Sequence, residues 1–389
     1  MNDSAPDAVA SPIRETKANA STVPFVDLAF VHEGVKSRIL QDVAEVIETG
    51  SFIDGAQVAE FEERYASFCR RRFCVGVSSG LDALRLALLA GGVEPGAEVI
   101  VPANTFIATV EAVRQAGAQP VFVDADERDY NVNPAAVAAS VTPKTQWLVP
   151  VHLYGQMADM RSLLRIANGC NVYIIEDACQ AHGAERDGLI AGGAGLASAF
   201  SFYPAKNLGA LGDAGAVVTS DPDFAAAVRA LRSHGQTAKY SHEREGYTAR
   251  LDTIQAVALS HKLPLLEMWN QQRVLAAAFY NDSLYGVGDL VLPPVPIGSH
   301  PVWHLFVVTT SKRAELEDFL GGRGIATGRH YPDPLHLMPM YRDFGYGRGA
   351  FPVAERLAKE SLSLPIFPGI KEAQLTAVVT SIRDFYRRG

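Results

Sequence analysis

The chain has 389 residues, of which 48% are hydrophobic and 20% are charged. A chain of this composition can bury a large core, which excludes disordered and fibrous proteins, and its length predicts about two to three domains. The net charge of -8 argues against a nucleic-acid partner, because polyanion binding normally needs a basic surface. No apolar run approaches the roughly 18 residues that span a bilayer, so we expect no membrane partner.

The first residues of the chain are rich in Ala, Ser, Asp and Pro. They contain no apolar segment of signal-peptide length, and we expect residues 1–22 to form a mobile tail. Four cysteines in so long a chain do not make a disulfide framework, and the spacing of cysteines and histidines fits no metal site. These features favour a cytoplasmic protein without a metal.

Beyond the tail, short apolar runs alternate with helical periodicity, a pattern typical of an α/β domain with a largely parallel sheet. Apolar residues three or four apart predict two helices, within residues 35–47 and 58–68. Seven strand-like runs follow, at residues 73–77, 99–101, 120–123, 147–151, 172–175, 199–203 and 216–219. We therefore predict one large α/β domain over residues 23–250.

The last third of the chain predicts a second, smaller unit. Residues 251–284 have the pattern of one or two long helices with apolar and charged faces, which could link domains or line a subunit interface. We then expect a strand at 303–309, a helix at 313–321, a strand at 325–330 and a closing helix from about residue 372. Linking helices and a small C-terminal α+β domain would together occupy residues 251–389.

Residues 76–80, Gly-Val-Ser-Ser-Gly, match the G-x-S-x-G nucleophile elbow of serine hydrolases. Asp177 and His330 follow Ser78 in the Ser, Asp, His order of the α/β-hydrolases, which makes a hydrolase the alternative from another class. The order of elements opposes it, because an elbow normally follows several strands and the chain before Ser78 is mostly helical.

The same turn also fits the start of a helix. Ser79, Gly80, Leu81 and Asp82 approximate a capping box, which would leave backbone N–H groups pointing outward. Such a helix N-terminus is a natural phosphate site, and Gly80 would allow close approach. An ordinary capped helix remains the simpler interpretation of this turn taken alone.

Two more segments, taken together with the predicted phosphate site, indicate a cofactor. Residues 172–177 form an apolar run that ends in carboxylates, and strand ends are where α/β sheets bind ligands. Lys206 follows another apolar run, between Pro204 and several glycines, where partial burial would lower its pKa and make it a usable amine. An amine, a strand-end acid and a phosphate site together point to pyridoxal phosphate.

Each residue has a role in that chemistry. Lys206 would form the Schiff base with the coenzyme aldehyde and move protons once substrate displaces it. Asp177 would pair with the pyridine nitrogen and keep it protonated, which makes the ring an electron sink. Gln180 could hydrogen-bond the ring hydroxyl. Phe106 could stack on the ring, although a buried core aromatic is an equally simple interpretation.

Several stretches of the sequence resemble the DegT/DnrJ/EryC1/StrS sugar aminotransferases, a family of fold-type I pyridoxal-phosphate enzymes. In chain order they are SSGLDALRLAL, VPANTFIAT, GAQPVFVDAD, VPVHLYGQMADM, IIEDACQAHGA, FSFYPAKNLGALGDAGAVVT, ARLDTIQAVAL and GRHYPDPLHL. The resemblance covers nearly the whole chain from Phe25. It implies a seven-stranded, mostly parallel mixed sheet with helices on both faces, a smaller C-terminal domain, and a homodimer with shared active sites.

The resemblance also implies a set of site residues. Lys206 is the catalytic residue, and pyridoxamine phosphate forms during the reaction. The cofactor-binding residues it implies are Gly80, Leu81, Phe106, Asp177, Gln180, Ser201, Lys206 and Thr248. Many relatives have Thr in place of Leu81, and relatives usually have Asn in place of Thr248, supplied across the dimer interface to the coenzyme phosphate. Phosphate affinity could therefore be lower in this chain.

Four more residues are implied near the substrate: Arg250, His330, Tyr331 and His336. Each has a structural alternative, which is an interface ion pair for Arg250 and a packed loop for the histidines. The resemblance implies transamination, because relatives that dehydrate sugars have histidine in place of Lys206.

The residues after Lys206 resemble members of the family that aminate C3 of nucleotide-linked 3-keto sugars. We therefore expect a dTDP-linked 3-keto-6-deoxyhexose to become the 3-amino-3,6-dideoxyhexose, with L-glutamate as amino donor. A UDP-linked 2-acetamido-3-keto uronic acid is the main alternative substrate. A catalytically idle or regulatory homologue is a third possibility, and the intact set of Lys206, Asp177 and Gln180 argues against it.

Overall fold

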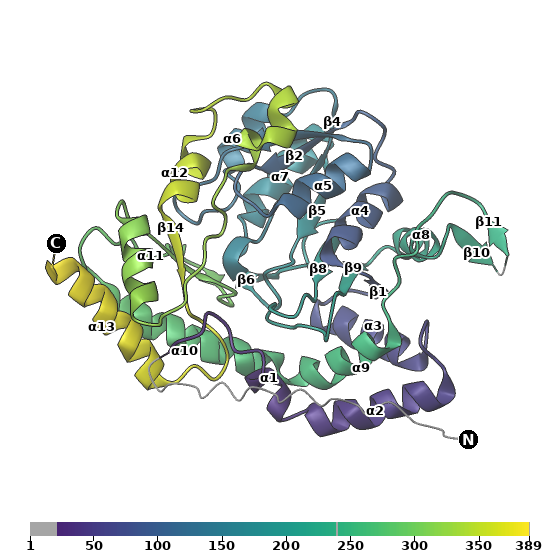
Figure 1. Cartoon of the computed structure of the whole chain (residues 1–389). Helices are drawn as coiled ribbons and strands as arrows, with labels where there is room; N and C mark the ends of the chain where they lie inside the picture. The colour runs from purple at the N-terminus through teal and green to yellow at the C-terminus, as the bar shows by residue number, and fades with distance from the viewer. Residues whose placement is uncertain (1–21, 239, 389) are drawn as a thin grey trace, which may run out of the picture.

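The computed structural model describes residues 22–238 and 240–388, and a seven-stranded sheet forms its centre (Figure 1). The strands in spatial order are β1 (Phe73–Val77), β9 (Gly215–Thr219), β8 (Ala197–Ser201), β5 (Tyr173–Asp177), β4 (Thr145–Leu148), β2 (Glu98–Pro102) and β3 (Gln119–Val123). Strand β9 runs antiparallel to both neighbours, and the other strands share one direction. This confirms the predicted mostly parallel mixed sheet.

Helices cover both faces of the sheet, and each face has its own apolar core. Helices α4 (Gly80–Ala90), α5 (Ile107–Gln115) and α8 (Pro222–Arg232) pack on one face. Helices α3 (Ala56–Phe68), α6 (Pro134–Ser140), α7 (Met160–Cys170) and α9 (Thr253–Lys262) pack on the other. Successive residues of β2 belong to opposite cores: Val99 and Val101 lie in the core that contains α4, and Ile100 lies in the core that contains α3. Burial on both faces explains the nearly continuous apolar strands.

The predicted long helical segment consists of two helices. Helix α9 ends at Lys262, the 3-10 turn η2 (Leu263–Leu265) contains Pro264, and α10 (Leu266–Leu284) continues from it. Proline removes a backbone donor and interrupts the helix at this point. Helix α9 packs against α3 and against α2 (Lys36–Thr49), which follows the short α1 (Phe30–Glu33).

The C-terminal region forms a third apolar core. Strand β13 (Phe306–Thr309) pairs antiparallel with β14 (Ser361–Leu364), and α10, α11 (Arg313–Gly322) and α13 (Glu372–Arg388) pack around them. The predicted strand at 325–330 is wrong. Ile325 bridges to Val23 and Gly328 to Ser363, so this segment passes between two partners and forms no continuous ladder.

Smaller elements complete the structure. A three-stranded sheet combines β6 (Glu185–Arg186), β7 (Leu189–Ile190) and β12 (Ser299–His300), and the β10 (Gln236–Ala238) and β11 (Ser241–His242) hairpin projects from the body (Figure 1). The short helices η1 (Leu153–Gly155), η3 (Leu335–Leu337), η4 (Pro339–Phe344) and α12 (Pro352–Glu360) lie in connecting segments. Leu335, Tyr341 and Ala354 join the core beneath α4, so C-terminal residues also cover the large sheet.

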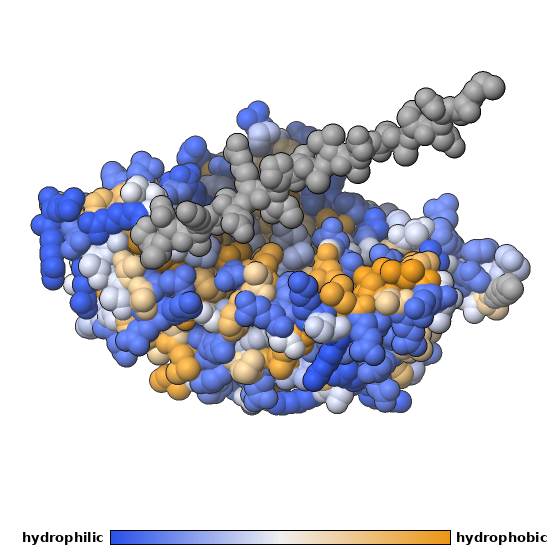
Figure 2. All heavy atoms as spheres, turned by 60° about the horizontal axis from the view of Figure 1, so that its bottom comes forward, coloured by the Kyte–Doolittle hydropathy of each residue, from blue (hydrophilic) through white to orange (hydrophobic). Residues whose placement is uncertain are grey.

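The predicted tail lies outside the described residues, apart from Thr22. Within the described part of the chain, none of the helices combines the length and the apolar character that a membrane span requires. The face at the bottom of Figure 1 shows apolar patches among charged areas (Figure 2). Large apolar side chains exposed on the helices of this region include Leu40 and Ile47 of α2 and Met268 and Leu275 of α10.

Candidate active site

The candidate site lies where parallel strands end at one edge of the sheet. Gly80 begins α4 shortly after β1, Phe106 lies between β2 and α5, Asp177 ends β5, and Lys206 follows β8. Because these four strands run in the same direction, their carboxyl ends meet at one edge, which is the usual ligand-binding edge of an α/β sheet. Segments separated by more than 100 residues in the sequence thus contribute to one candidate site.

Lys206 is held in a closed loop. The Ala210 N–H donates to the Phe202 carbonyl at 2.7 Å, and the Lys206 N–H donates to the Tyr203 carbonyl at 2.8 Å. Burial lowers the pKa of the Lys206 ammonium, while Cys179 and Asp177 oppose the shift. A lowered pKa increases the fraction of neutral amine, which is the nucleophilic form.

Three histidines surround Lys206, and two of them, His182 and His304, have no place in the sequence-based prediction. Burial and then the Lys206 charge lower the pKa of His182 to about 3, of His330 to about 4, and of His304 well below its usual value. All three rings are therefore neutral at neutral pH, and they place no cation beside the amine. Sequence spacing offers no signal for this cluster, because β5, the segment before β13 and the 330 loop meet only in the fold.

Asp177 is buried and hydrogen-bonded through both oxygens. The Thr109 hydroxyl donates to Oδ2 at 2.8 Å, and the Cys179 N–H donates to Oδ1 at 3.2 Å. Thr109 belongs to α5 and is a positioning residue that the sequence analysis missed. Its signal is its place in the stretch Asn-Thr-Phe-Ile-Ala-Thr, which follows β2 at the ligand-binding edge.

Gln180, Tyr331 and Phe106 form a connected group. The Gln180 Oε1 accepts from the Tyr154 N–H at 2.7 Å, and its Nε2 donates to the Tyr331 hydroxyl at 3.1 Å. The Phe106 and Tyr331 rings lie 5.3 Å apart between centroids. Phe106 is 49% exposed, which excludes the buried core role and leaves its ring open to a planar ligand.

The start of α4 fits an anion. The Ser79 hydroxyl caps the helix by accepting from the Asp82 N–H at 3.1 Å, and the first-turn N–H groups of Gly80 and Leu81 have no partner within the helix. A Cβ on Gly80 would lie 2.7 Å from the Cβ of Ser201, so only glycine allows α4 to approach β8 this closely. The helix terminus and Ser201 lie side by side and could together hold a phosphate.

The structure does not assemble a hydrolase triad. The Ser78 hydroxyl donates to the carboxylate of Asp82, and Asp177 is bonded to Thr109. The His330 ring lies 2.8 Å from the Ser363 hydroxyl, through Nδ1. None of the three residues of the motif is hydrogen-bonded to another within the described part of the chain, and Ser78 serves the first turn of α4.

Two predicted residues lie apart from Lys206. Thr248 is exposed, and its hydroxyl lies 2.9 Å from Nε2 of His234, near the β10 and β11 hairpin. The His336 ring is buried, with Nε2 3.1 Å from Glu355 and the ring 4.7 Å from that of Phe351. Thr248 thus lies on the surface of the chain, and His336 has the packed-loop role.

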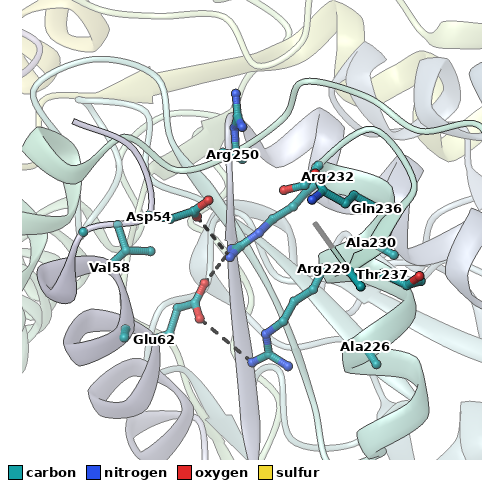
Figure 3. Close-up of a pocket in the computed structure, with 14 residues that line it drawn as sticks. Asp54, Val58, Glu62, Ala226, Arg229, Ala230, Arg232, Gln236, Thr237 and Arg250 are labelled. Carbon is teal, nitrogen blue, oxygen red and sulfur yellow. Dashed lines mark hydrogen bonds and ion pairs between the residues drawn. The ribbon is translucent and has the colours of Figure 1, made fainter. Parts of the chain in front are cut away.

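Arg250 borders a separate cavity of about 640 Å³ between α3, α8 and the hairpin (Figure 3). Arg232 donates there to Glu62 and to the Gly76 carbonyl, both at 2.6 Å. Arg250 points away from the Asp54 and Glu62 carboxylates, and no ion pair of Arg250 occurs within residues 22–238 and 240–388. The lining of the cavity comes mainly from α3, α8 and β10, and neither Lys206 nor Asp177 lines it.

A buried amine, a strand-end carboxylate and an open helix terminus around one sheet edge define a pyridoxal-phosphate enzyme. The residues present fit that group: the open N-terminus of α4 would hold its phosphate, Asp177 would pair with its ring nitrogen, and Lys206 would bind its aldehyde. The chain belongs to the DegT/DnrJ/EryC1/StrS aminotransferase family, which matches residues 34–383. It is therefore an aminotransferase whose cofactor is pyridoxal phosphate.

Relatives with named activities cover almost the whole chain. It is 43% identical over 373 residues to a dTDP-3-amino-3,4,6-trideoxy-α-D-glucose transaminase of Streptomyces venezuelae, which spans 96% of this chain and 98% of that protein. It is 42% identical over 363 residues to a UDP-N-acetyl-3-dehydro-α-D-glucosamine 3-aminotransferase of Acidithiobacillus ferrooxidans, spanning 93% of this chain and 98% of that protein.

A solved structure has the same fold. The crystal structure of DesV from S. venezuelae, in complex with a ketimine intermediate, superposes with a TM-score of 0.92 at 44% identity, covering 95% of this chain and 99% of that one. In the described part of this chain, no group of three or more His, Cys, Asp or Glu residues is placed to hold a metal ion.

Proposed function

We propose that this aminotransferase converts a dTDP-linked 3-keto-6-deoxyhexose to the 3-amino-3,6-dideoxyhexose, with L-glutamate as amino donor. The observation that carries the proposal is Lys206 in its closed loop, at the same sheet edge as Asp177 and the N-terminus of α4. The likeness to a dTDP-sugar transaminase over nearly the full length supports the substrate class.

The cofactor, when bound, supplies an electron sink that lets a proton leave and return at the carbon bearing nitrogen. The chain supplies the positioning and the proton transfer. Lys206 would carry the proton, because burial lowers the pKa of its ammonium and so makes the amine easier to deprotonate. Asp177, oriented by the Thr109 hydrogen bond, would pair with the ring nitrogen, and the exposed ring of Phe106 would stack on the cofactor ring.

We also propose a homodimer in which each active site receives residues from both subunits. Thr248 is exposed and bonded to His234 near the projecting hairpin, so it is available to a neighbouring subunit rather than to its own site. The exposed Leu40, Ile47, Met268 and Leu275 provide apolar surface that a second copy can cover. All four cysteines are free thiols, in keeping with a reducing cytoplasm.

The UDP-linked 2-acetamido-3-keto uronic acid remains the second candidate substrate. Likeness to an aminotransferase for a UDP-linked N-acetyl-3-dehydro sugar supports the UDP nucleotide and the acetamido group at nearly the same identity, and a relative 36% identical is named for the UDP-linked 3-oxo-glucuronate. The two candidates differ in the nucleotide, the C2 acetamido group and the C6 carboxylate. A site that accepts one of them must leave polar groups unsatisfied with the other, which supports strong discrimination.

The test measures glutamate-dependent turnover of both keto sugars and the absorbance of the bound coenzyme. We expect glutamate to change the coenzyme spectrum, and the dTDP sugar to restore it and appear as the 3-amino product. Turnover of the UDP sugar alone would reject the preferred substrate. A protein that binds coenzyme but shows no spectral change with glutamate would instead be a regulatory homologue.

A further inference from the structure

The loop that carries Lys206 is held from outside the site by a second lysine. Lys262 is the last residue of α9 and is only 1% exposed. Its ammonium donates to the Gly209 carbonyl at 2.7 Å and lies 2.8 Å from Nε2 of His32. Because Gly209 comes three residues after Lys206, a buried cation is attached to the turn that presents the amine.

His32 provides the second acceptor for this cation. Its Nδ1 lies 2.5 Å from the Leu28 carbonyl, which can only accept, so Nδ1 carries the proton and Nε2 of the neutral ring is left to accept from Lys262. Burial and then the Lys262 charge lower the pKa of His32, which keeps the ring neutral. The end of α9 also favours a cation, because the helix dipole is negative there.

The loop is closed so tightly that a shift of Gly209 must move its other residues. A Cβ on Gly209 would lie 2.3 Å from the Pro204 carbonyl oxygen, so the two ends of the turn are in contact. Asn207 anchors the opposite side, since its Nδ2 donates to the Val302 carbonyl at 2.9 Å and to Asn270 Oδ1 at 2.8 Å. Lys206 thus lies between one anchor to α9 and another to α10.

Lys262 does not have room to meet a substrate. The cavity between residues 26–31, the Lys206 loop and Lys262 has a volume of about 10 Å³, which holds no more than a single water molecule. We propose that Lys262 is a positioning residue for transamination: its ammonium fixes Gly209 and thereby the place of the Lys206 amine. The proposal rests on the role proposed above for Lys206.

Three variants distinguish the loss of the tether, which is the hydrogen bond from the Lys262 ammonium to the Gly209 carbonyl, from general destabilisation of the fold. Lys262→Met keeps a long side chain and removes the charge, and Lys262→Arg restores a donor. His261→Gln is the matched control, because His261 lies in the same turn of α9 and contacts Asp42 at 2.7 Å rather than the loop. Amide hydrogen exchange of residues 204–211 is measured in the full-length protein without coenzyme. We expect about tenfold faster exchange in Lys262→Met, partial recovery in Lys262→Arg and no change in His261→Gln.

With coenzyme bound, Lys262→Met should lower kcat about 10- to 100-fold and leave KM within about twofold, since only the position of the reacting group changes. Wild-type exchange in Lys262→Met overturns the proposal, whatever its activity. If Lys262→Met does not fold, His32→Leu removes one acceptor of the same ammonium, and unchanged exchange there overturns the proposal equally. Faster exchange together with an active Lys206→Ala protein would reject the role of Lys206 and leave the tether intact.

Discussion

Glu176 and Asp177 end the same strand, yet they lie on opposite faces of the sheet because side chains alternate along β5. Asp177, at the site, receives hydrogen bonds from Thr109 and the Cys179 N–H. On the other face, Glu176 is saturated by the ring of His152, the hydroxyl of Ser198 and the N–H groups of Gly192, Ala194 and Gly195.

The difference separates a structural carboxylate from the one that we propose binds the cofactor. Burial alone would raise the pKa of Glu176, but hydrogen bonding and charge from His152, with the backbone donors and Ser198, lower it to about 2. Glu176 therefore stays ionised and organises the segment before β8. Asp177 has fewer protein partners and lies beside the amine of Lys206. Two carboxylates that are adjacent in sequence thus have different roles: Glu176 stabilises the fold, and Asp177 is proposed to act in catalysis.

The largest effect should come from removing the amine on the ligand face. We expect Lys206→Ala to lose about 10⁴-fold in turnover, because the proton carrier and the cofactor attachment disappear together. Turnover and the coenzyme spectrum with glutamate measure this, and Lys144→Ala serves as the control because Lys144 is exposed, away from the sheet edge. A glutamate-dependent spectral change of normal rate in Lys206→Ala would contradict the assignment.

The next largest effect should come from neutralising Asp177. Asp177→Asn keeps the shape of the side chain and removes the charge beside the ring, so we expect about 10²- to 10³-fold lower kcat. Thr109→Val removes the 2.8 Å hydrogen bond to Asp177, together with the 3.1 Å contact to the Thr105 hydroxyl, and should lower kcat about tenfold. Steady-state kinetics with glutamate compares the two. Equal losses in both variants would mean that orientation, not charge, is what Asp177 contributes.

On the structural face, Glu176→Gln should change stability rather than chemistry. The folded-state pKa of about 2 lies below the ordinary value of 4.5, so ionised Glu176 stabilises the fold above about pH 4.5 and this stabilisation is lost as the pH falls toward 2. We expect Glu176→Gln to lower the free energy of unfolding by about 3 kcal/mol at neutral pH. On acidification, the free energy of unfolding of the variant should fall less than that of the wild-type protein. Urea unfolding across this pH range measures both effects. If the free energy of unfolding of the variant depended on pH as steeply as that of the wild-type protein, the assignment would be contradicted.

The sequence predicted those features of the site that depend on neighbours along the chain. Lys206, Asp177 and Gln180 follow apolar strands directly, and the parallel direction of the strands brings their ends together. His182 and His304 could not be found in this way, because their interactions with Lys206 arise between segments that only the fold brings together. Thr109 follows β2 at the same edge, but its hydrogen bond to Asp177 joins two segments that only the fold brings together. Lys262 was missed for the same reason, since it lies in a helix whose pattern shows only amphipathicity.

The small domain shows the same limit at the level of strands. The segment 325–330 has an apolar start, but its bridges to Val23 and Ser363 give it no single partner. Strand β14, with the sequence Ser-Leu-Ser-Leu, is too short and too poor in β-branched residues to be recognised alone, and it forms because β13 supplies a ladder. In both cases, the presence or absence of a pairing partner distant in sequence decides whether a strand forms.

The smallest effect should come at the exposed position that departs from the family pattern. Thr248→Asn adds an amide that can donate to a phosphate, and in the proposed homodimer we expect it to tighten coenzyme binding about threefold to tenfold, with Thr248→Ala unchanged or weaker. Fluorescence titration of the coenzyme-free protein measures the Kd, and His234→Gln controls for losing the 2.9 Å contact within the same subunit. Identical Kd values in the Asn and Ala variants would mean that residue 248 does not reach the phosphate, and that the backbone N–H groups of α4 bind it without help from a neighbouring subunit.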